Sequence, residues 1–433
     1  MTSSYARRRW TAATLAAVTA LTVVGCAAGG NGGSADGEGI SLRFTWWGSD
    51  ARHEKTLDAI ALFEEQNPGV TIVPEYSGWD GYWDALSTKA AANDLPDIMQ
   101  QVDPYIFDYA QNGTLADLTE YSDVLDLEPF SPAIMEMSTV DGAVYGVPGG
   151  MTGMSAWVNP ATIESVGIDL PDDQTWSWED YAEYAASITS ASGGSIVGSG
   201  QVTFDSQMFN IWARQQGEQV FSETGVGFKP ETLSSWWEFV LELQQDGSIP
   251  TAEQSVEAVG KSLEESGFAT GQTAIQGGWA SQIGAVQAVV DTPLALMQLP
   301  GESEAEVRGV FVKPSLHYSV AASSEHPEEA AKFVDFLVNT VDAGEILGAD
   351  RGTPANPDVL EELLPSMAAG DQLAAEYLLE ANELVETSLP IPPPGASMFE
   401  EAFIRYSQEV VFERMTPAEA AEALIAEVDA AVA

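Results

Sequence analysis

From Ile40 onward, short strand-like runs of apolar residues alternate with longer segments whose apolar residues recur at helical spacing. The strand-like runs cover residues 40–48, 70–77 and 96–103. The helix-like segments between them cover residues 50–69 and 79–94. Strands that alternate with helices are typical of an α/β sheet with parallel strand pairs. In such a sheet ligands collect at the carboxyl ends of the strands, so the ends of these runs become candidate site positions.

After residue 150 a similar but more helical pattern resumes. Helices are expected within residues 170–189, 229–247, 323–348, 364–385 and 415–433. The third of these segments is expected to form two helices. Residues 389–395, with the sequence LPIPPPG, cannot be helical, because proline lacks the amide donor and clashes with the preceding turn.

The first forty residues differ from the rest of the chain. Three arginines at positions 7–9 precede an acid-free apolar run at residues 10–24, which is typical of a secretory signal and too short for a membrane span. The run ends in LTVVGC, which resembles a bacterial lipobox and predicts a signal peptide 1–25 with a lipid on Cys26. A lone cysteine can also be a small buried hydrophobe, but its place after the signal favours lipidation. The glycine-rich segment 26–39 predicts a flexible tether.

The charge balance is strongly acidic. The 433 residues include 16 Lys and Arg against 66 Asp and Glu, a formal net charge of −50. Neither nucleic acid nor an anionic membrane surface is an expected partner of such a chain, and a solvated acidic exterior is the ordinary explanation. The length exceeds what one core usually serves, so two domains or one large domain are expected. Cys26 is the only cysteine, so no intramolecular disulfide can form.

Eight short motifs follow one another in the order seen in a known protein family. They are FEEQNPGVTIVPEY, WDGYWDALSTKAAANDLPDIMQ, NGTLADLT, DGAVYGVPGG, WVNPATIESVGIDLPDDQTWSWEDY, AIQGGWASQIG, EEAAKFVDFLV and GTPAN. With them, the chain after Gly39 resembles the extracellular solute-binding proteins (family 1) of bacterial carbohydrate ABC transporters, of the oligosaccharide-binding lipoprotein type. Each motif alone is weakly specific, and their order behind a lipobox carries the resemblance.

The resemblance implies an α/β, two-lobe periplasmic-binding-protein-like fold with a hinge and an interlobe cleft. The chain would cross the hinge near residues 145–150, 299–302 and 343–350. The N-terminal lobe would combine residues 40–147 with 301–345, and the C-terminal lobe residues 148–300 with 346–433. Composition supports only the general location of the crossings, since each contains Gly or Pro.

The resemblance also implies a receptor without enzymatic activity. It would bind an oligosaccharide by hinge closure and then dock on ABC transporter permease subunits. It would need no cofactor or metal, act as a monomer, and stay lipid-anchored through Cys26 at the extracellular face of the cytoplasmic membrane. The stretch TWWGSDARHEKTLDAI followed by GWDGYWDAL is similar to the branch of the family that takes up pectin fragments, including rhamnogalacturonan pieces.

Tryptophans are the first candidates for a sugar site. A sugar ring presents C–H faces that stack on flat aromatic rings, and hydroxyls that bind carboxylates and amides. Trp46 and Trp47 end the first strand and face opposite sides. We expect one of them in the core and the other, Trp47 with Gly48 beside it, in the cleft.

A second pair, Trp79 and Trp83, lies four residues apart at the start of the second helix. That spacing places both rings on one helical face, which could be core as easily as a sugar platform. Because the segment follows a strand end, Trp79 and the neighbouring Asp80 are candidates for ligand contact.

Three more candidates lie in later segments. Trp279 follows AIQGG, whose glycines let the backbone approach closely, and the resemblance implies a sugar-stacking aromatic here. Trp157 is a candidate as well, although the resemblance implies that an aromatic at this place is often structural. Asp103 ends the third strand and could bind a hydroxyl, or simply cap the helix that begins near Pro104.

Three basic side chains are candidates for a charged ligand. Arg52 and His53 lie just beyond the first strand, and Arg351 lies beside a hinge crossing. A guanidinium could fork onto a sugar carboxylate. Each arginine could instead pair with one of the 66 acids.

Other tryptophans are assigned to packing. Trp236 and Trp237 lie inside an apolar helical segment, which favours the core. Trp176 and Trp178 flank the cap-like Ser177, and a hydrophobic staple at a helix start explains one of them.

The competing functions are a secreted glycoside hydrolase and a cell-surface glycan adhesin. A glycosidase needs two carboxylates roughly 5–10 Å apart, and no segment resembles a glycosidase motif. The three histidines lack metal-binding spacing, and neither a G-x-S-x-G elbow nor a P-loop occurs. An adhesin would give no reason for tryptophans at strand ends.

Overall fold

The computed structural model describes residues 39–432, except residues 80, 104, 201, 223–224, 260, 394 and 397. The expected signal peptide, Cys26, the expected tether up to residue 38 and Asp80 therefore lie outside the described residues. Gly39–Ala433 forms one compact unit. None of the described helices combines the length and the apolar character needed to cross a bilayer.

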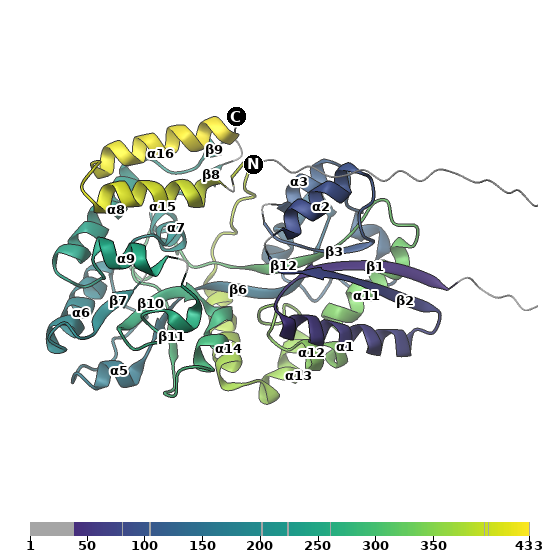
Figure 1. Ribbon diagram of the computed structural model, residues 1–433, viewed down its shortest axis with the longest axis horizontal. Helices are drawn as coiled ribbons and strands as arrows, with labels where there is room; N and C mark the ends of the chain where they lie inside the picture. Colours follow the sequence, from purple (N-terminus) through teal and green to yellow (C-terminus); the bar gives the residue numbers. More distant parts are fainter. Residues whose placement is uncertain are drawn as a thin grey trace, which may run out of the picture. The chain divides into compact units, whose positions relative to one another are not determined.

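Eight strands form one mixed sheet (Figure 1). Their order is β2 (Val70–Ser77), β1 (Ile40–Trp47), β3 (Ile98–Gln101), β12 (Val312–Val320), β6 (Val147–Val158), β10 (Thr273–Trp279) and β7 (Val197–Gly200), with β11 (Ala295–Met297) paired to β6. β1 is parallel to β2 and β3, as predicted. β12 runs antiparallel to β3 and β6. The carboxyl ends of β1, β2 and β3 therefore lie at the same end of the sheet.

The helices expected from periodicity are all present. They are α1 (Asp50–Gln66), α2 (Tyr82–Ala91), α6 (Trp178–Ala191), α8 (Pro230–Gln245), α11 (Pro327–Asn339), α12 (Val341–Leu347), α14 (Ala369–Leu384) and α16 (Pro417–Val432). The other helices are α3 (Tyr105–Gln111), α4 (Pro132–Glu136), α5 (Pro160–Glu164), α7 (Ser206–Gln215), α9 (Ala252–Ala258), α10 (Ile283–Gln287), α13 (Pro357–Leu363) and α15 (Met398–Val411). Short 3₁₀ turns cover Leu118–Tyr121, Leu263–Glu265, Ala280–Gln282 and Leu364–Ser366. Two small hairpins pair β4 (Thr139–Val140) with β5 (Ala143–Val144), and β8 (Phe221–Ser222) with β9 (Gly225–Val226).

The start of α6 shows how local sequence sets a helix end. The Ser177 side chain accepts from the amide of Asp180, whose carboxylate accepts from the Ser177 amide, which makes a capping box. The ring of Trp176 lies 5.6 Å from that of Tyr181, one turn into the helix. The expected hydrophobic staple is therefore present, and Trp176 is the tryptophan that forms it.

Two large hydrophobic clusters divide the compact unit into two lobes. The first lobe packs β1–β3 and β12 with α1 and α11, and includes Phe44 and Phe333. The second lobe packs β7 and β10 with α6–α8, α15 and α16, and includes Trp236 and Trp237, which are fully buried as expected. β6 contributes to both clusters, and Figure 1 shows β6 and β12 running between the two groups of elements.

The lobe boundaries given above stay predictions. Side-chain packing changes from one cluster to the other within β6, between Met151 and Met154, and again around Phe311 and Val312. The first change is close to the predicted crossing at 145–150, and the second lies beyond the one predicted at 299–302.

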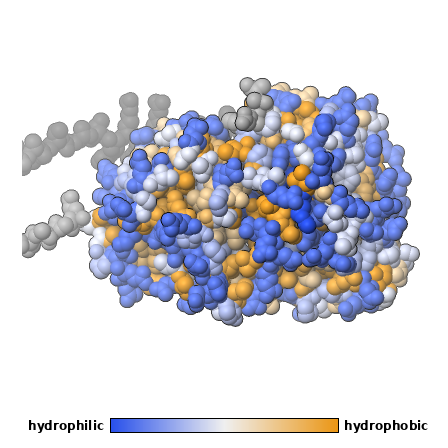
Figure 2. All heavy atoms as spheres, turned by 180° about the vertical axis from the view of Figure 1, so that it is seen from behind, coloured by the Kyte–Doolittle hydropathy of each residue, from blue (hydrophilic) through white to orange (hydrophobic). Residues whose placement is uncertain are grey.

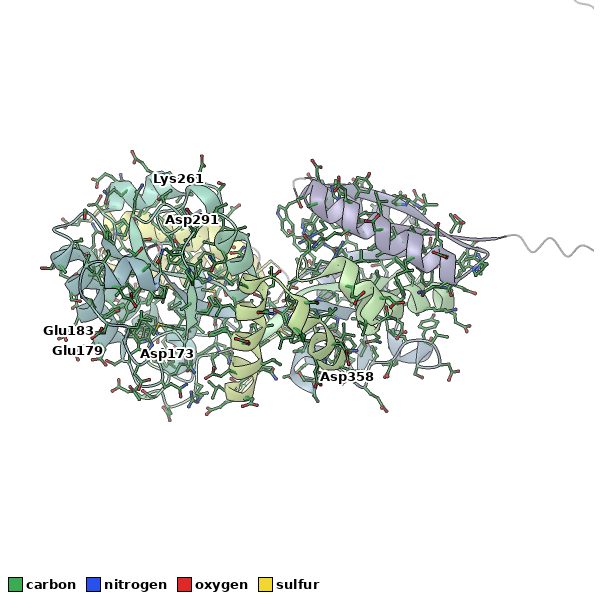
Figure 3. All side chains as sticks on the ribbon, turned by 90° about the horizontal axis from the view of Figure 1, so that it is seen from below. Asp173, Glu179, Glu183, Lys261, Asp291 and Asp358 are labelled. Atoms are coloured by element: carbon green, nitrogen blue, oxygen red, sulfur yellow. The ribbon has the colours of Figure 1, made fainter. Side chains whose placement is uncertain are left out.

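The exterior is largely hydrophilic on the face seen in Figure 2. Exposed acids such as Glu179 and Glu183 project from one side of α6 (Figure 3). A solvated acidic surface therefore accounts for much of the negative charge.

Candidate ligand-binding site

The carboxyl end of the β1–β3 group faces the second lobe. Asp103, just beyond β3, accepts a hydrogen bond from Lys313 Nζ of β12 at 3.0 Å. Asp103 and Met137 of the first lobe line a cavity of ≈150 Å³ together with Trp279 of the second lobe. We call this the smaller cavity, and it lies where the two lobes meet.

An aromatic platform stands at the same end of the sheet, made of Trp47, Trp79, Tyr82, Trp83 and Tyr105. The Trp47 ring lies 5.2 Å from Trp79 and 5.6 Å from Trp83, and Trp83 stacks on Tyr105 with ring centroids 3.8 Å apart. Trp79 is 50% exposed, whereas Trp47 is 8% exposed. The expected ligand contact of Trp47 stays a prediction, and Trp79 is the ring of the platform with the most free surface.

Trp46 occupies the opposite face of β1. It is fully buried, and its Nε1 donates to His53 Nδ1 at 3.1 Å. The His53 ring in turn lies 4.3 Å from the half-exposed Tyr76 ring. His53 therefore orders the Trp46 side of the strand, and its contact with a ligand stays a prediction.

The two candidate arginines already have protein partners. Arg52 donates to the Asp350 carboxylate at 2.7 Å and to the Asp350 carbonyl at 2.6 Å. Arg351 is 3% exposed and donates to Gln100 and Thr56, and burial lowers its pKa. The structure thus favours the alternative that arginines pair internally, and a ligand contact by either one stays a prediction.

Gly48 lies directly against Arg52. Its amide donates to Ser77 at 3.0 Å, and a Cβ at this position would overlap the Arg52 side chain. The glycine therefore lets Arg52 reach across the end of β1 to Asp350.

A larger cavity of ≈440 Å³ lies in the second lobe and is within the usual size range for small-molecule sites. Trp279 at the end of β10 lines both cavities, as do Ser206 and Gln207 of α7. Trp157 also lines the larger cavity but is only 1% exposed, packed against Phe268 with ring centroids 5.9 Å apart. Its position fits the structural role left open above, and its Nε1 has no hydrogen-bond partner in the described part of the chain.

Several cavity residues escaped the sequence analysis. Lys313 lies over the Trp279 ring, with Nζ 5.7 Å from the ring centroid. Asp205 caps α7 by accepting from the amides of Gln207 and Met208 at 2.9 and 3.1 Å. An aspartate before a helix reads as an ordinary cap, so only the cavity beside it suggests a second role.

The electrostatics of the cavity single out Asp205. Asp205 keeps some accessible surface, yet the surrounding protein is dense enough that burial raises its pKa to about 6, with a further contribution from Glu400 on α15. Both carboxyl groups line the larger cavity.

A buried polar group of β3 and β12 residues lies near Asp103 and Lys313, whose charges act on His317. Gln101, His317 and Ser319 are fully buried, and the structure gives their side-chain polar atoms no protein partner within the described residues. Burial lowers the pKa of His317 to about 4, so the ring is neutral at pH 7. In the part of the chain that the structure describes, no group of three or more His, Cys, Asp or Glu side chains is placed to hold a metal ion.

The fold and this arrangement define a two-lobed α/β binding protein, with aromatic rings and polar groups gathered where the lobes meet. The chain belongs to the bacterial extracellular solute-binding protein family, whose model matches residues 58–375. The recognition made from the sequence motifs and the expected fold class are thereby confirmed.

Three similar proteins illustrate the relationship. The family 1 extracellular solute-binding protein of Alicyclobacillus acidocaldarius is 26% identical, with a TM-score of 0.75 covering 90% of this chain and 98% of that one. A periplasmic oligogalacturonide-binding protein of Yersinia enterocolitica, in complex with saturated digalacturonic acid, is 24% identical, with a TM-score of 0.77 and coverage of 90% and 98%. At that identity the likeness shows the fold alone.

The third is a lipoprotein of Streptomyces antibioticus, 26% identical over 176 residues, which are 40% of this chain and 38% of that protein. The chain spans about two fifths of the length of the curated relatives that it matches.

Proposed function

We propose that this protein is a transport receptor that binds an oligosaccharide between its lobes and delivers it to ABC transporter permease subunits. The observation that carries the proposal is that Trp279 of the second lobe and Asp103 of the first line one cavity, at the end of the sheet that also bears the aromatic platform. Aromatic rings supply flat apolar surfaces for sugar C–H faces, and the neighbouring carboxylates and amides can bind hydroxyls. Family membership supports the receptor role.

Closure about the hinge is the proposed mechanism. β6 and β12 pair with each other and connect the lobes. A ligand that contacts both lobes only in the closed form shifts the population toward that form by its differential affinity. The closed, loaded receptor would then dock on the permease as a monomer, without a cofactor.

The proposed location is the extracellular face of the cytoplasmic membrane, through a lipid on Cys26. The lipobox-like sequence supports it, as does the lipoprotein among the relatives. Labelling of cells with a radioactive fatty acid should mark the wild-type protein and not a Cys26→Ser variant.

The experiment that tests binding is calorimetry of the mature protein against a panel of neutral and uronate-containing oligosaccharides. We expect at least one sugar to bind, and Trp279→Ala to weaken it about tenfold or more, because the ring lines both cavities. Leu170→Ala, at an exposed position of the second lobe, is the control. Unchanged affinity in Trp279→Ala would contradict the site.

The expectation of a pectin or rhamnogalacturonan fragment stays a prediction. It is supported by the similarity of residues 45–60 and 78–86 to that branch of the family. The oligogalacturonide-binding protein shares the fold with this chain.

A glycoside hydrolase is a second candidate, because one observation favours it. Asp205 lines a cavity together with Glu400, and burial raises the pKa of Asp205 to about 6. A carboxyl group with a raised pKa beside a second carboxyl group is the arrangement that a glycosidase uses for general-acid catalysis. Release of reducing ends during the titration would support this candidate against the receptor. An adhesin would bind glycans without a change in the distance between the lobes.

A further inference from the structure

The larger cavity is lined by carboxyl groups that no buried cation among its described lining residues balances. The carboxyl groups of Asp205 and Glu400 line the larger cavity. Asn210 Oδ1 and Asp103 Oδ1, which belong to residues lining the smaller cavity, are buried without a partner among the described residues. The walls of the larger cavity also carry neutral side chains that can donate, among them Gln276, Gln282 and Trp279. An ionised Asp205 carboxylate can only accept hydrogen bonds, so the ligand group beside it must donate, as a hydroxyl does and as a carboxylate does not.

The basic groups near the cavities are already engaged or lie at the surface. Lys313 donates to Asp103 at 3.0 Å and covers the Trp279 ring. Lys261 lines the larger cavity but is exposed, at the surface of the second lobe (Figure 3). These two are the basic residues that line either cavity in the described part of the chain. A sugar carboxylate in the larger cavity would thus face Asp205 without a buried cation to balance it.

We propose, resting on the function proposed above, that the larger cavity is a subsite for uncharged sugar units, with Asp205 as a hydroxyl acceptor, and that it excludes uronates. A hydroxyl that donates to an ionised carboxylate forms a strong, charge-assisted hydrogen bond. A second carboxylate placed beside Asp205 is repelled, which makes the same group a filter against acidic sugars. This departs from two expectations, that an arginine forks onto a uronate and that the ligand is a uronate-containing pectin fragment.

The filter depends on pH. Asp205 faces Glu400 from α15, Lys261 beyond α9 and Tyr181 from α6. Because the pKa of Asp205 is raised to about 6 by burial, its charge is present at pH 7.5 and largely lost at pH 5. Rejection of uronates should therefore weaken on acidification.

Matched sugars test the proposal. The probes are α-1,4-linked galactobiose and galactotriose against the corresponding galacturonic acid dimer and trimer, which differ only at C6, within a panel of neutral gluco-, manno- and xylo-oligosaccharides. Calorimetry at pH 7.5 should find a neutral ligand that binds at least tenfold more tightly than either uronate. At pH 5 the ratio of neutral to uronate affinity should fall several-fold. A uronate that binds as tightly as any neutral sugar overturns this inference and leaves the receptor function standing, whereas a panel without any binder overturns the receptor function as well.

Asp205→Asn identifies the residue responsible. Asparagine keeps the acceptor that caps α7, so the fold should be retained, which thermal unfolding checks. We expect the variant to bind uronates at least tenfold more tightly, relative to neutral sugar, than the wild type does at pH 7.5, and to lose the pH dependence of that ratio. Glu401→Gln removes a charge from the exposed side of α15 without touching either cavity and should change nothing. An unaltered ratio in Asp205→Asn overturns the role of Asp205.

Discussion

Two neighbouring tryptophans at the end of β1 pack on opposite faces of the strand, Trp46 against His53 and Trp47 against the platform. Trp46 is fully enclosed and hydrogen-bonded to His53, so Trp46→Ala should lower the free energy of unfolding by about 3–5 kcal/mol. Urea unfolding followed by circular dichroism measures this. A loss below about 1 kcal/mol would contradict the assignment of Trp46 to the core.

Trp79 is the platform residue whose substitution can test ligand binding with little effect on the stability of the fold, because its ring is half exposed. It is half exposed and contacts Trp47 and Trp83 at ring distances of 5.2 and 5.7 Å. Trp79→Ala should weaken sugar binding about five- to tenfold, because a stacking surface is lost, with a small change in melting temperature. Trp47→Ala should reduce stability as well as binding, since Trp47 is buried beside it. Wild-type affinity in Trp79→Ala would remove the platform from the site.

The ionisation of Asp205 should also appear in the stability of the unliganded protein. Burial raises its pKa to about 6 from the ordinary 3.8, so the folded state holds the proton more tightly than the unfolded state. Ionised Asp205 therefore reduces stability above pH 6, and this cost disappears as the pH falls toward 4. Asp205→Asn should stabilise the fold by about 1–3 kcal/mol at pH 8 and by little at pH 4. Urea titrations at both pH values measure it, Asp117→Asn controls for exchange of a capping aspartate, and an equal effect at both pH values would contradict the explanation.

At the scale of elements, Asp350 ties α1 to the segment that follows α12. Arg52 of α1 donates one hydrogen bond to the Asp350 carboxylate and one to the Asp350 backbone carbonyl. The carboxylate also lies 3.6 Å from the guanidinium of Arg351. Asp350→Ala leaves both guanidinium groups short of a carboxylate in a largely buried place, so we expect a loss of about 2–4 kcal/mol. Glu345 is an exposed acid on α12. Glu345→Ala should lower the free energy of unfolding by less than about 0.5 kcal/mol, which is the usual limit for a surface substitution. Equal effects would show that the link is not structural.

At the scale of the whole molecule, ligand binding should change the distance between the lobes. Cys26 is the only cysteine, so a Cys26→Ser background accepts dyes at Glu183→Cys on α6 and Asp358→Cys on α13, two exposed positions (Figure 3). α6 packs in the second hydrophobic cluster, whereas α13 packs on α12 beside Ala355 of the first cluster, in contrast to the predicted lobe boundary at residue 346. Energy transfer between the dyes should change on addition of the bound sugar and stay unchanged in Trp279→Ala at the same sugar concentration. A constant signal at saturation would contradict hinge closure and leave a rigid adhesin as the better description.

The sequence by itself determined the elements and the family. Strands β1–β3, the helices between them and the capping box at Ser177 follow from periodicity and local hydrogen bonds, which act over a few residues. The ordered motifs identified the solute-binding family. These features could be predicted because the information for each lies in one stretch of chain.

Only the tertiary structure decided which side chains meet. Lys313 and Asp103 are 210 residues apart in sequence, and Arg52 and Asp350 are 298 apart, so no local pattern shows that these groups neutralise one another. The same holds for exposure: the spacing of Trp79 and Trp83 predicted one helical face, which fits a core as well as a platform, but α2 begins only at Tyr82 and Trp79 lies before it. The expectation of a shared helical face was therefore wrong, and the two rings meet through tertiary packing. The charge of the cavity, and with it the kind of sugar we expect, depends on contacts that exist only once the chain has folded.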